Sequence, residues 1–358
     1  MSRYAIAVLP GDGVGPEVVD AALPLLGKLA HGASFSFAFE THPAGALHFR
    51  ATGEALPEAT LAAARDADAI FFGAMGWPSI RYEDGTEIAP QLDLRIALDL
   101  YAGVRPARAI PGIPAALNDA RAAAIDFVVV RESTEGLFAS RGRGEVLADR
   151  EARDTLLITR AGSERVHDFA FRLAARRKSR GRPGRVTCVD KANVFRSMAF
   201  FRKVFDERAA RAPGIVADHR YVDAAALELV RKPWEFDVLV TENMFGDILS
   251  DEAAALIGGM GVAPSADIGD RHGLFQPCHG SAPDIAGQGK ANPVAAILSA
   301  AMMLDWLAER HGDGALAEAA VRLERAVDRA FAAGRLRPIE LGGSDGTQAI
   351  AGAIAAEL

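Results

Sequence analysis

The chain has 358 residues, 50% of them hydrophobic and 24% charged, a balance typical of a globular protein large enough for two domains. Its formal net charge of -7 argues against a nucleic-acid-binding protein, and no stretch reaches the roughly 18 apolar residues of a membrane-spanning helix. Cys188 and Cys278 are too few for a disulfide framework or a zinc site. We therefore expect a cytoplasmic protein without nucleic-acid or membrane partners, whose first residues form a strand and not a signal peptide.

Short apolar runs alternate with helical patterns along most of the chain. The strand-like runs are YAIAVL, FSFAF, AIFFG, IDFVVV, RVTCV, IVADHRYV and FDVLV. Helical patterns cover residues 16–30, 57–66, 92–101, 163–179, 194–211, 293–310 and 315–333. This alternation predicts an α/β protein with a parallel or mixed sheet, in which ligands gather beyond the carboxyl ends of the strands. The polar segment 142–159 is compatible with an extended arm.

The first strand-like run leads into a glycine-rich turn, LPGDGVGPEVV, that opens a helix. Its glycine spacing is not the complete G-x-G-x-x-G fingerprint of dinucleotide-binding proteins. As a nucleotide signal this turn is therefore weak.

The segment TENMFGDILSDEAAAL, residues 241–256, places Asp247 and Asp251 four residues apart, on one face of a helix, with no Lys or Arg in the segment. Asp247 could cap the helix or complement its dipole. Alternatively, the two carboxylates are ligands of a divalent cation such as Mg²⁺. Asp223, at the end of the run HRYVD, is a candidate third carboxylate.

Four basic residues stand at the ends of predicted elements: Arg95, Arg105, Arg131 and Lys191. Converging arginines favour a polycarboxylate substrate, because the guanidinium fork matches a carboxylate, although each arginine alone could lie on the surface. A lysine after a strand can transfer protons near carboxylates, and it can equally be a solvated loop residue. The basic run 172–185 favours a helix end with a solvated loop over a binding patch.

A long irregular loop, FQPCHGSAPDIAGQGKANP, covers residues 275–293. Loops of this length are often functional. Asp284 could accept hydrogen bonds from ribose hydroxyls, as an acidic residue does in NAD sites. His279 could take part or be structural.

Together, the motifs LPGDGVGPEVV, VDKANVF, NMFGDILSDEAAAL and HGSAPDIAGQGKANPVAAILSAAMML resemble the β-decarboxylating dehydrogenases. This family acts on 3-isopropylmalate, isocitrate, homoisocitrate and tartrate or D-malate. The resemblance implies oxidation of a malate-type 2-hydroxy acid by NAD with Mg²⁺ or Mn²⁺, followed by loss of CO₂. It also implies a three-layer α/β fold whose mixed sheet is shared by two intertwined domains. Residues 1–100 and 257–358 would bind the cofactor, and residues 101–256 would bind substrate and metal and form the dimer.

The resemblance also implies roles for single residues. Asp223, Asp247 and Asp251 would bind the metal, Arg95, Arg105 and Arg131 the substrate carboxylates, and Lys191, with Asp223, would act in catalysis. The adenosine part of the cofactor would contact His279, Gly280, Ser281, Ala282, Asp284, Ile285, Gly287 and Asn292. Since the family supplies Lys191 and Asp223 from the partner subunit, a homodimer with shared sites is expected.

Two positions depart from the family pattern. Phe138 in RESTEGLF stands where the family has a tyrosine that protonates the enol. Gln91 in APQLDLR replaces the leucine that lines the isopropyl pocket of isopropylmalate enzymes. The substrate therefore stays open between isopropylmalate and the isocitrate, homoisocitrate or tartrate/D-malate alternatives, and a non-catalytic regulatory subunit is a further alternative.

Overall fold

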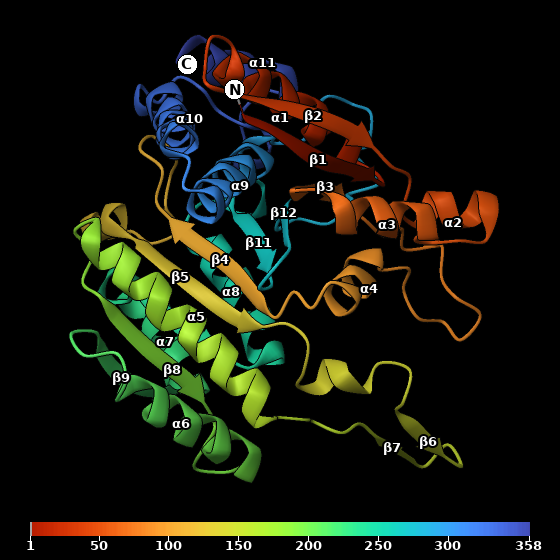
Figure 1. Cartoon of the computed structure of the whole chain (residues 1–358), viewed down its shortest axis with the longest axis vertical. Helices are drawn as coiled ribbons and strands as arrows, with labels where there is room; N and C mark the ends of the chain where they lie inside the picture. Colours follow the sequence, from red (N-terminus) through yellow and green to blue (C-terminus); the bar gives the residue numbers. More distant parts are fainter. Residues whose placement is uncertain (1) are drawn as a thin grey trace. The chain divides into compact units, whose positions relative to one another are not determined.

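The computed structural model describes residues 2–358, which form two compact units, and Figure 1 shows their helices and strands. Unit 1 comprises residues 2–99, Ala109–Ala116 and Ile257–Leu358. Unit 2 comprises Leu100–Arg108 and Leu117–Leu256. Neither unit is one continuous stretch of chain.

Unit 1 contains five strands in the order β2-β1-β3-β12-β11. Their bounds are β1 Ser2–Gly11, β2 Phe35–Thr41, β3 Ala69–Ala74, β11 Pro264–Ile268 and β12 Gly273–Pro277. β1, β2, β3 and β12 run parallel, and β11 is antiparallel to β12. All six residues of β3, AIFFGA, are buried, as expected for a strand covered on both faces.

The helices of unit 1 pack around these strands. They are α1 Gly15–Ala30, α2 Ala46–Thr52, α3 Glu58–Asp66, α4 Pro90–Ala97, α9 Val294–His311, α10 Gly314–Ala332 and α11 Thr347–Ala356. The sequence pattern did not predict α2 and α11. It also placed the end of α4 at residue 101, which is wrong, because Asp99 adopts a φ of 52° that no helix allows.

Five strands of the large sheet belong to unit 2, in the order β4-β5-β10-β8-β9. Their bounds are β4 Ala102–Arg108, β5 Asp126–Glu132, β8 Arg185–Asp190, β9 Val216–Tyr221 and β10 Val238–Thr241. β4 is antiparallel to β5 and the other pairs are parallel, which confirms the mixed α/β class. The expected arm contains a hairpin of β6 Glu145–Leu147 and β7 Glu151–Arg153, with exposed residues throughout.

Four helices belong to unit 2: α5 Arg160–Ser179, α6 Arg196–Ala209, α7 Val222–Arg231 and α8 Asn243–Leu256. In the register of the sheet, Thr241 pairs with Arg131 on one side and with Val189 on the other. The carboxyl ends of β5, β8 and β10 therefore meet at one edge, where ligands of α/β sheets bind. No helix within residues 2–358 has the length and apolarity that crossing a membrane requires.

Candidate active site

Arg131, near the end of β5, is the centre of the polar cluster at this edge of unit 2. Its side chain is buried, and Nε and Nη2 donate to Asn243 Oδ1 over 2.8 and 2.5 Å. Nη1 donates to Asp247 Oδ1. A Cβ on Gly246 would lie 2.6 Å from Arg131 Cβ, so the glycine of NMFGD makes room for this side chain. Arg131 is thus held in one orientation, with Asn243, which sequence reasoning missed, as its anchor.

Glu242, the residue before α8, caps this helix. Its buried carboxylate accepts from the backbone N–H groups of Met244 and Phe245, over 3.1 and 2.7 Å. Burial raises the pKa of Glu242, and these two hydrogen bonds oppose the rise. The first turn of α8 contains no acidic residue, so the interpretation of Asp247 as a helix cap is wrong.

Asp247 and Asp251 lie one turn apart on α8, without a basic residue on the helix. Burial raises the pKa of Asp251, the negative charge of Asp247 raises it further, and Arg105 and Arg131 act in the opposite direction. Two close carboxylates that repel each other are hard oxygen donors of the kind that fits Mg²⁺ or Mn²⁺. Within the part of one chain that the structure describes, no group of three acidic, His or Cys side chains gathers in a metal-binding arrangement. Asp223 therefore does not complete the pair within a single chain.

Lys191 and Asp223 form an ion pair, with 2.6 Å between Nζ and Oδ1. The hydrogen bond from Lys191 lowers the pKa of Asp223. Asp223 was expected at a strand end and lies in the first turn of α7 instead. Asp190, at the end of β8, accepts from Ala192 N and from the guanidinium of Arg202, which fixes the turn that presents Lys191.

The remaining predicted substrate residues divide between the units. Arg105 lies buried on β4, opposite Val129 of β5 in unit 2. Arg95 lies in the last turn of α4 in unit 1, with its Nε 3.1 Å from Asp267 Oδ2, and both side chains are buried. Gln91 lies in the first turn of the same helix, and its Oε1 is buried without a hydrogen-bond partner among the described residues.

Phe138 lies in a short 3₁₀ turn, Leu137–Ser140, of unit 2. The Cζ atom of Arg131 is 4.9 Å from the centroid of its ring. This separation is within the range of a cation–π contact. The phenyl ring therefore supports the guanidinium and offers no acidic hydrogen at this position.

The glycine-rich loop of unit 1 borders a pocket of about 330 Å³. Four of the residues predicted to bind the cofactor line it: His279, Ala282, Ile285 and Asn292. The predicted residue Ser281 is buried and donates to Gly76 O over 2.6 Å. Asp284, Gly280 and Gly287 are exposed and do not line the pocket.

His279 presents an unused acceptor at this pocket. Its Nδ1 lies 2.9 Å from Gly280 O and donates to it, so the neutral ring carries a lone pair on Nε2. Burial lowers the pKa of His279, which favours this neutral form. Nε2 is buried without a partner among residues 2–358, so it can accept a hydrogen bond from a bound polar molecule.

Seven further residues line the same pocket. Lys290 and Ala291 belong to the irregular loop 275–293 that the sequence singled out, and sequence reasoning missed the other five: Val14, Met260, Gly261, Ile339 and Glu340. Val14 belongs to the first glycine turn, and its N–H donates to Ser281 O over 2.8 Å. Gly13 adopts a φ of 59°, and a Cβ there would lie 1.8 Å from Ser281 O. The glycine spacing of this turn is therefore explained by its close packing against Ser281 of the loop 275–293.

Residues 5–354 match the model of the isocitrate/isopropylmalate dehydrogenase family. The chain belongs to this family. It is 44% identical to the 3-isopropylmalate/3-methylmalate dehydrogenase of Methanocaldococcus jannaschii, with 95% of each chain covered. It is 42% identical to the 3-isopropylmalate dehydrogenase of Moorella thermoacetica, with 94% of this chain and 92% of the relative covered.

Among solved structures, the isocitrate dehydrogenase of Methylococcus capsulatus matches with a TM-score of 0.86 and 38% identity over 99% of both chains. The resemblance seen in the sequence motifs is confirmed. The protein is accordingly an oxidative, β-decarboxylating dehydrogenase of the isopropylmalate dehydrogenase type.

Proposed function

We propose that the protein catalyses the oxidative β-decarboxylation of a 3-substituted malate with NAD, releasing a 2-oxo acid and CO₂. The observation that carries this proposal is the buried guanidinium of Arg131, which Asn243 orients beside the acidic pair of α8. A fixed cation next to two carboxylates suits a substrate that binds an arginine through one carboxylate and a divalent cation through another oxygen.

The residues of this chain have complementary proposed roles. Arg105 and Arg131, with Arg95, hold the substrate carboxylates. Lys191 would accept the hydroxyl proton after giving up a proton of its own, since it forms an ion pair with Asp223 in the free chain. NAD, when bound, would supply the oxidant that takes the hydrogen of C2 as hydride. The bond between C3 and the β-carboxylate then breaks, CO₂ departs, and the electron pair stays on the substrate as an enolate that takes up a proton. A divalent cation held by Asp247 and Asp251 supplies Lewis-acid polarisation of the substrate oxygen when bound.

The third metal ligand is proposed to be Asp223 of the partner subunit, with Lys191 of the partner subunit beside it. Large apolar side chains on α7 and α8 support a dimer: Leu227, Val230 and Ile248 are 57%, 50% and 62% exposed, and the two helices pack against each other. Exposed apolar residues that gather on neighbouring helices commonly mark a protein interface.

A mixing experiment tests this shared site. Lys191→Ala and Asp251→Asn should each be inactive. If the site combines residues of two subunits, unfolding and refolding an equal mixture creates heterodimers with one intact site, and activity should return to about a quarter of the wild-type value. No recovery, together with heterodimers detected by mass spectrometry, would place both residues in one subunit's site.

For the cofactor we propose NAD, bound at the 330 Å³ pocket of unit 1. His279 Nε2, an acceptor without a hydrogen-bond partner, and the apolar lining residues Val14 and Ile285 support binding of the adenosine part of NAD in this pocket. Unit 1 would then bind the cofactor, and unit 2 the substrate and metal. Cys188 and Cys278 are free thiols. Free thiols are usual in the reducing cytoplasm, which is the location proposed for this protein.

A 3-isopropylmalate-type substrate is supported by the names of the relatives, and the buried, unpartnered Oε1 of Gln91 favours a smaller or more polar 3-substituent. The test is NAD reduction by the purified protein with Mn²⁺ and a panel of isopropylmalate, 3-methylmalate, D-malate, tartrate and isocitrate. Turnover of any member establishes an enzyme. Binding without turnover across the panel would favour the regulatory-subunit alternative, which Phe138 permits.

A further inference from the structure

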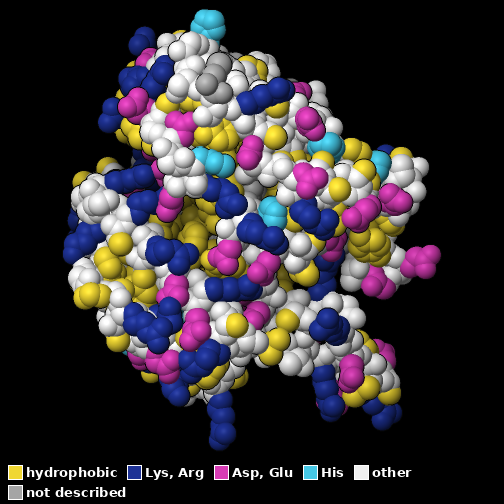
Figure 2. Space-filling model, viewed as in Figure 1, with side chains coloured by type: hydrophobic (Ala, Val, Ile, Leu, Met, Phe, Trp, Pro, Cys, Tyr) yellow, Lys and Arg dark blue, Asp and Glu magenta, His cyan; other side chains and the backbone are white. Residues whose placement is uncertain are grey.

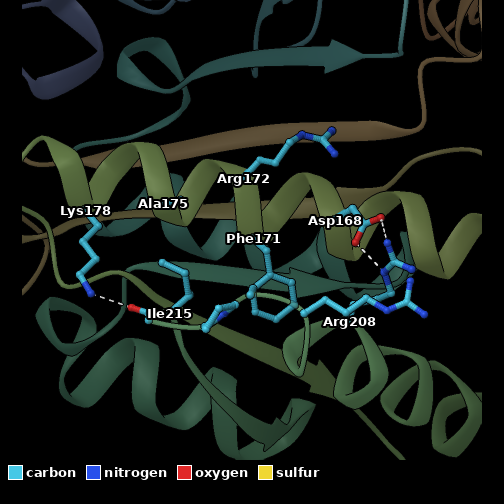
Figure 3. A pocket seen from close by; sticks show the side chains of 11 residues that line it. Asp168, Phe171, Arg172, Ala175, Lys178, Arg208 and Ile215 are labelled. Atoms are coloured by element: carbon cyan, nitrogen blue, oxygen red, sulfur yellow. Dashed lines mark hydrogen bonds and ion pairs between the residues drawn. The ribbon is translucent and has the colours of Figure 1, made fainter.

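The basic run 172–185 serves two purposes in the fold. Arg177 donates to Asp237 Oδ1 over 2.6 Å and to Asp126 Oδ1 over 2.9 Å, and Arg182 also pairs with Asp126. These two arginines hold α5 against the strands and are structural. Arg172 and Lys178 instead line a hollow of about 480 Å³, seen in Figure 3.

This hollow, which we call the α5–α6 pocket, lies wholly in unit 2. From α5 it is lined by Asp168, Phe171, Arg172, Ala175 and Lys178, and from the end of α6 and the loop after it by Arg208, Arg211, Ala212, Pro213, Gly214 and Ile215. Figure 3 shows Phe171 between the helix and the loop, near Ile215. The pocket therefore has apolar walls beneath a charged rim.

The charges of the rim are unbalanced. Four of the lining residues, Arg172, Lys178, Arg208 and Arg211, are cationic and one, Asp168, is acidic. Figure 3 shows the side chain of Arg172 directed away from the loop, and its Cζ lies 5.9 Å from the centroid of the Phe169 ring, so Lys178, Arg208 and Arg211 are the cations that can face a ligand. Figure 2 shows acidic side chains interspersed with basic ones over the visible face of the molecule. The rim of this pocket, by contrast, is dominated by one sign of charge.

Only one of the four cations has a carboxylate partner in the pocket. Arg208 binds Asp168, with 2.6 Å between Nε and Oδ1, and this bond raises the pKa of Arg208. Lys178 Nζ donates to Gly214 O over 2.6 Å, which fixes its position without a carboxylate partner. Among the described residues, neither Arg172 nor Arg211 forms an ion pair with a carboxylate.

We propose that the α5–α6 pocket binds a small phosphomonoester that carries an apolar group. The volume lies within the range of small-molecule sites. Guanidinium groups match phosphate oxygens, and Lys178 and Arg211, which have no carboxylate partner in the pocket, favour a dianion over a single carboxylate. The apolar group packs against Phe171 and Ile215. None of the residues proposed for substrate, metal or cofactor lines this pocket, so the site is additional to the active site.

Phenyl phosphate is a suitable probe because it combines a phosphate with an apolar ring and lacks the adenine of the cofactor. Isothermal titration calorimetry on the full-length protein should detect saturable binding. We expect the double variant Lys178→Gln/Arg211→Gln to weaken it at least about tenfold, and the matched control Lys203→Gln, an exposed cation of α6 outside the pocket, to change it less than about twofold. Phenol should not bind, and inorganic phosphate should bind more weakly than phenyl phosphate.

Three results would overturn the proposal. One is the absence of saturable binding of phenyl phosphate to the wild type. Another is unchanged affinity in the double variant, whose folding is checked by circular dichroism. The third is loss of binding in Arg131→Gln but not in the double variant, because the probe would then occupy the substrate site.

Discussion

The guanidinium of Arg131 stacks over the ring of Phe138, with 4.9 Å between Cζ and the ring centroid. The same guanidinium binds Asn243 and Asp247, so Phe138 lies directly beside the residues proposed to hold the substrate and the metal. The family resemblance places a proton-donating tyrosine at this position. The structure shows that the phenyl ring has a supporting contact there, which does not require a hydroxyl.

The first prediction concerns this ring. Oxidation does not need Phe138, whereas protonation of the enolate needs an acid, and general acid catalysis is typically worth about 10²–10⁴-fold. We expect a pre-steady-state burst of NADH followed by slower turnover, and we expect Phe138→Tyr to raise the steady rate. Stopped-flow absorbance at the nicotinamide band measures both. A wild type without a burst, unaffected by the substitution, would show that the missing hydroxyl does not limit the reaction.

The second prediction concerns the acidic pair of α8. Asp251→Asn should reduce turnover at least about 10²-fold without changing the unfolding temperature, because it removes a metal ligand and not a packing contact. Glu252→Gln, on the same helix, is the matched control and should retain activity. EDTA should abolish the activity of the wild type until Mn²⁺ is added back. Full activity in excess chelator would show that the reaction does not need a metal ion.

The third prediction is a preference for NAD over NADP. The exposed carboxylate of Asp284 would accept from the ribose 2′-hydroxyl and repel a 2′-phosphate. The ratio of kcat/KM for NAD to that for NADP should exceed one and fall at least about tenfold in Asp284→Lys/Ile285→Tyr, which introduces the pair that the family's NADP users carry. A wild type that prefers NADP would show that Asp284 does not bind the ribose 2′-hydroxyl.

The fourth prediction uses Gln91, whose buried Oε1 has no partner among residues 2–358. A polar 3-substituent could donate to this oxygen and an isopropyl group could not, a difference of about 1–3 kcal/mol. We therefore expect isopropylmalate not to lead the substrate panel, and Gln91→Leu to shift kcat/KM towards it by at least about tenfold. If isopropylmalate leads clearly and the substitution has little effect, Gln91 does not select the substrate.

The fifth prediction concerns stability at low pH. His167 is fully buried, with Nε2 3.2 Å from Phe201 O, and burial lowers its pKa from 6.5 to about 3. Between these pH values the unfolded chain binds a proton that the folded chain does not, so stability is lost as the pH falls below 6.5. From pH 7 to pH 5.5 this group should lower the free energy of unfolding by about 1 kcal/mol.

Urea unfolding of the wild type and of His167→Gln at both pH values measures this effect. Glutamine can still donate to the Phe201 carbonyl but does not titrate. The variant should lose about 1 kcal/mol less than the wild type over this pH interval. An identical pH dependence of the two proteins would show that the pKa of His167 is the same in the folded and the unfolded chain.

The sequence predicted β1, β2, β3, β5, β8, β9 and β10, because apolar runs and their charged ends are local signals. It did not predict β11 and β12, and its assignment of residues 275–277 to an irregular loop is wrong, because they belong to β12. β4, AGVRPAR, was not predicted, because Pro106 and two arginines interrupt the apolar pattern of a strand. α7 was not predicted, because it directly follows the strand-like run IVADHRYV. Asn243 and Glu340 were missed for another reason. Asn243 accepts a hydrogen bond from Arg131, which lies more than 100 positions away in the sequence. Glu340 accepts hydrogen bonds from the backbone of Gly261 and the side chain of Asn292. No local pattern encodes such contacts.

The α5–α6 pocket shows the same limit. The basic run was visible, but the sequence could not separate Arg177, which is bound to buried aspartates, from Lys178, which points at the pocket. That difference depends on the position of each residue around α5 and on the loop after α6. The interpretation of the whole run as a solvated helix end was therefore incomplete.

The order of strands in unit 1 has a consequence for synthesis of the chain on the ribosome. β3, with its buried sequence AIFFGA, pairs with β1 on one side and with β12 on the other, and β12 is made roughly 200 residues later. At about 5–20 residues per second, the outer edge of β3 stays unpaired for about 10–40 s while the whole of unit 2 is translated. An apolar strand edge exposed for that time invites aggregation. The nascent chain should therefore depend on a chaperone that covers β3 until the last third of the protein emerges.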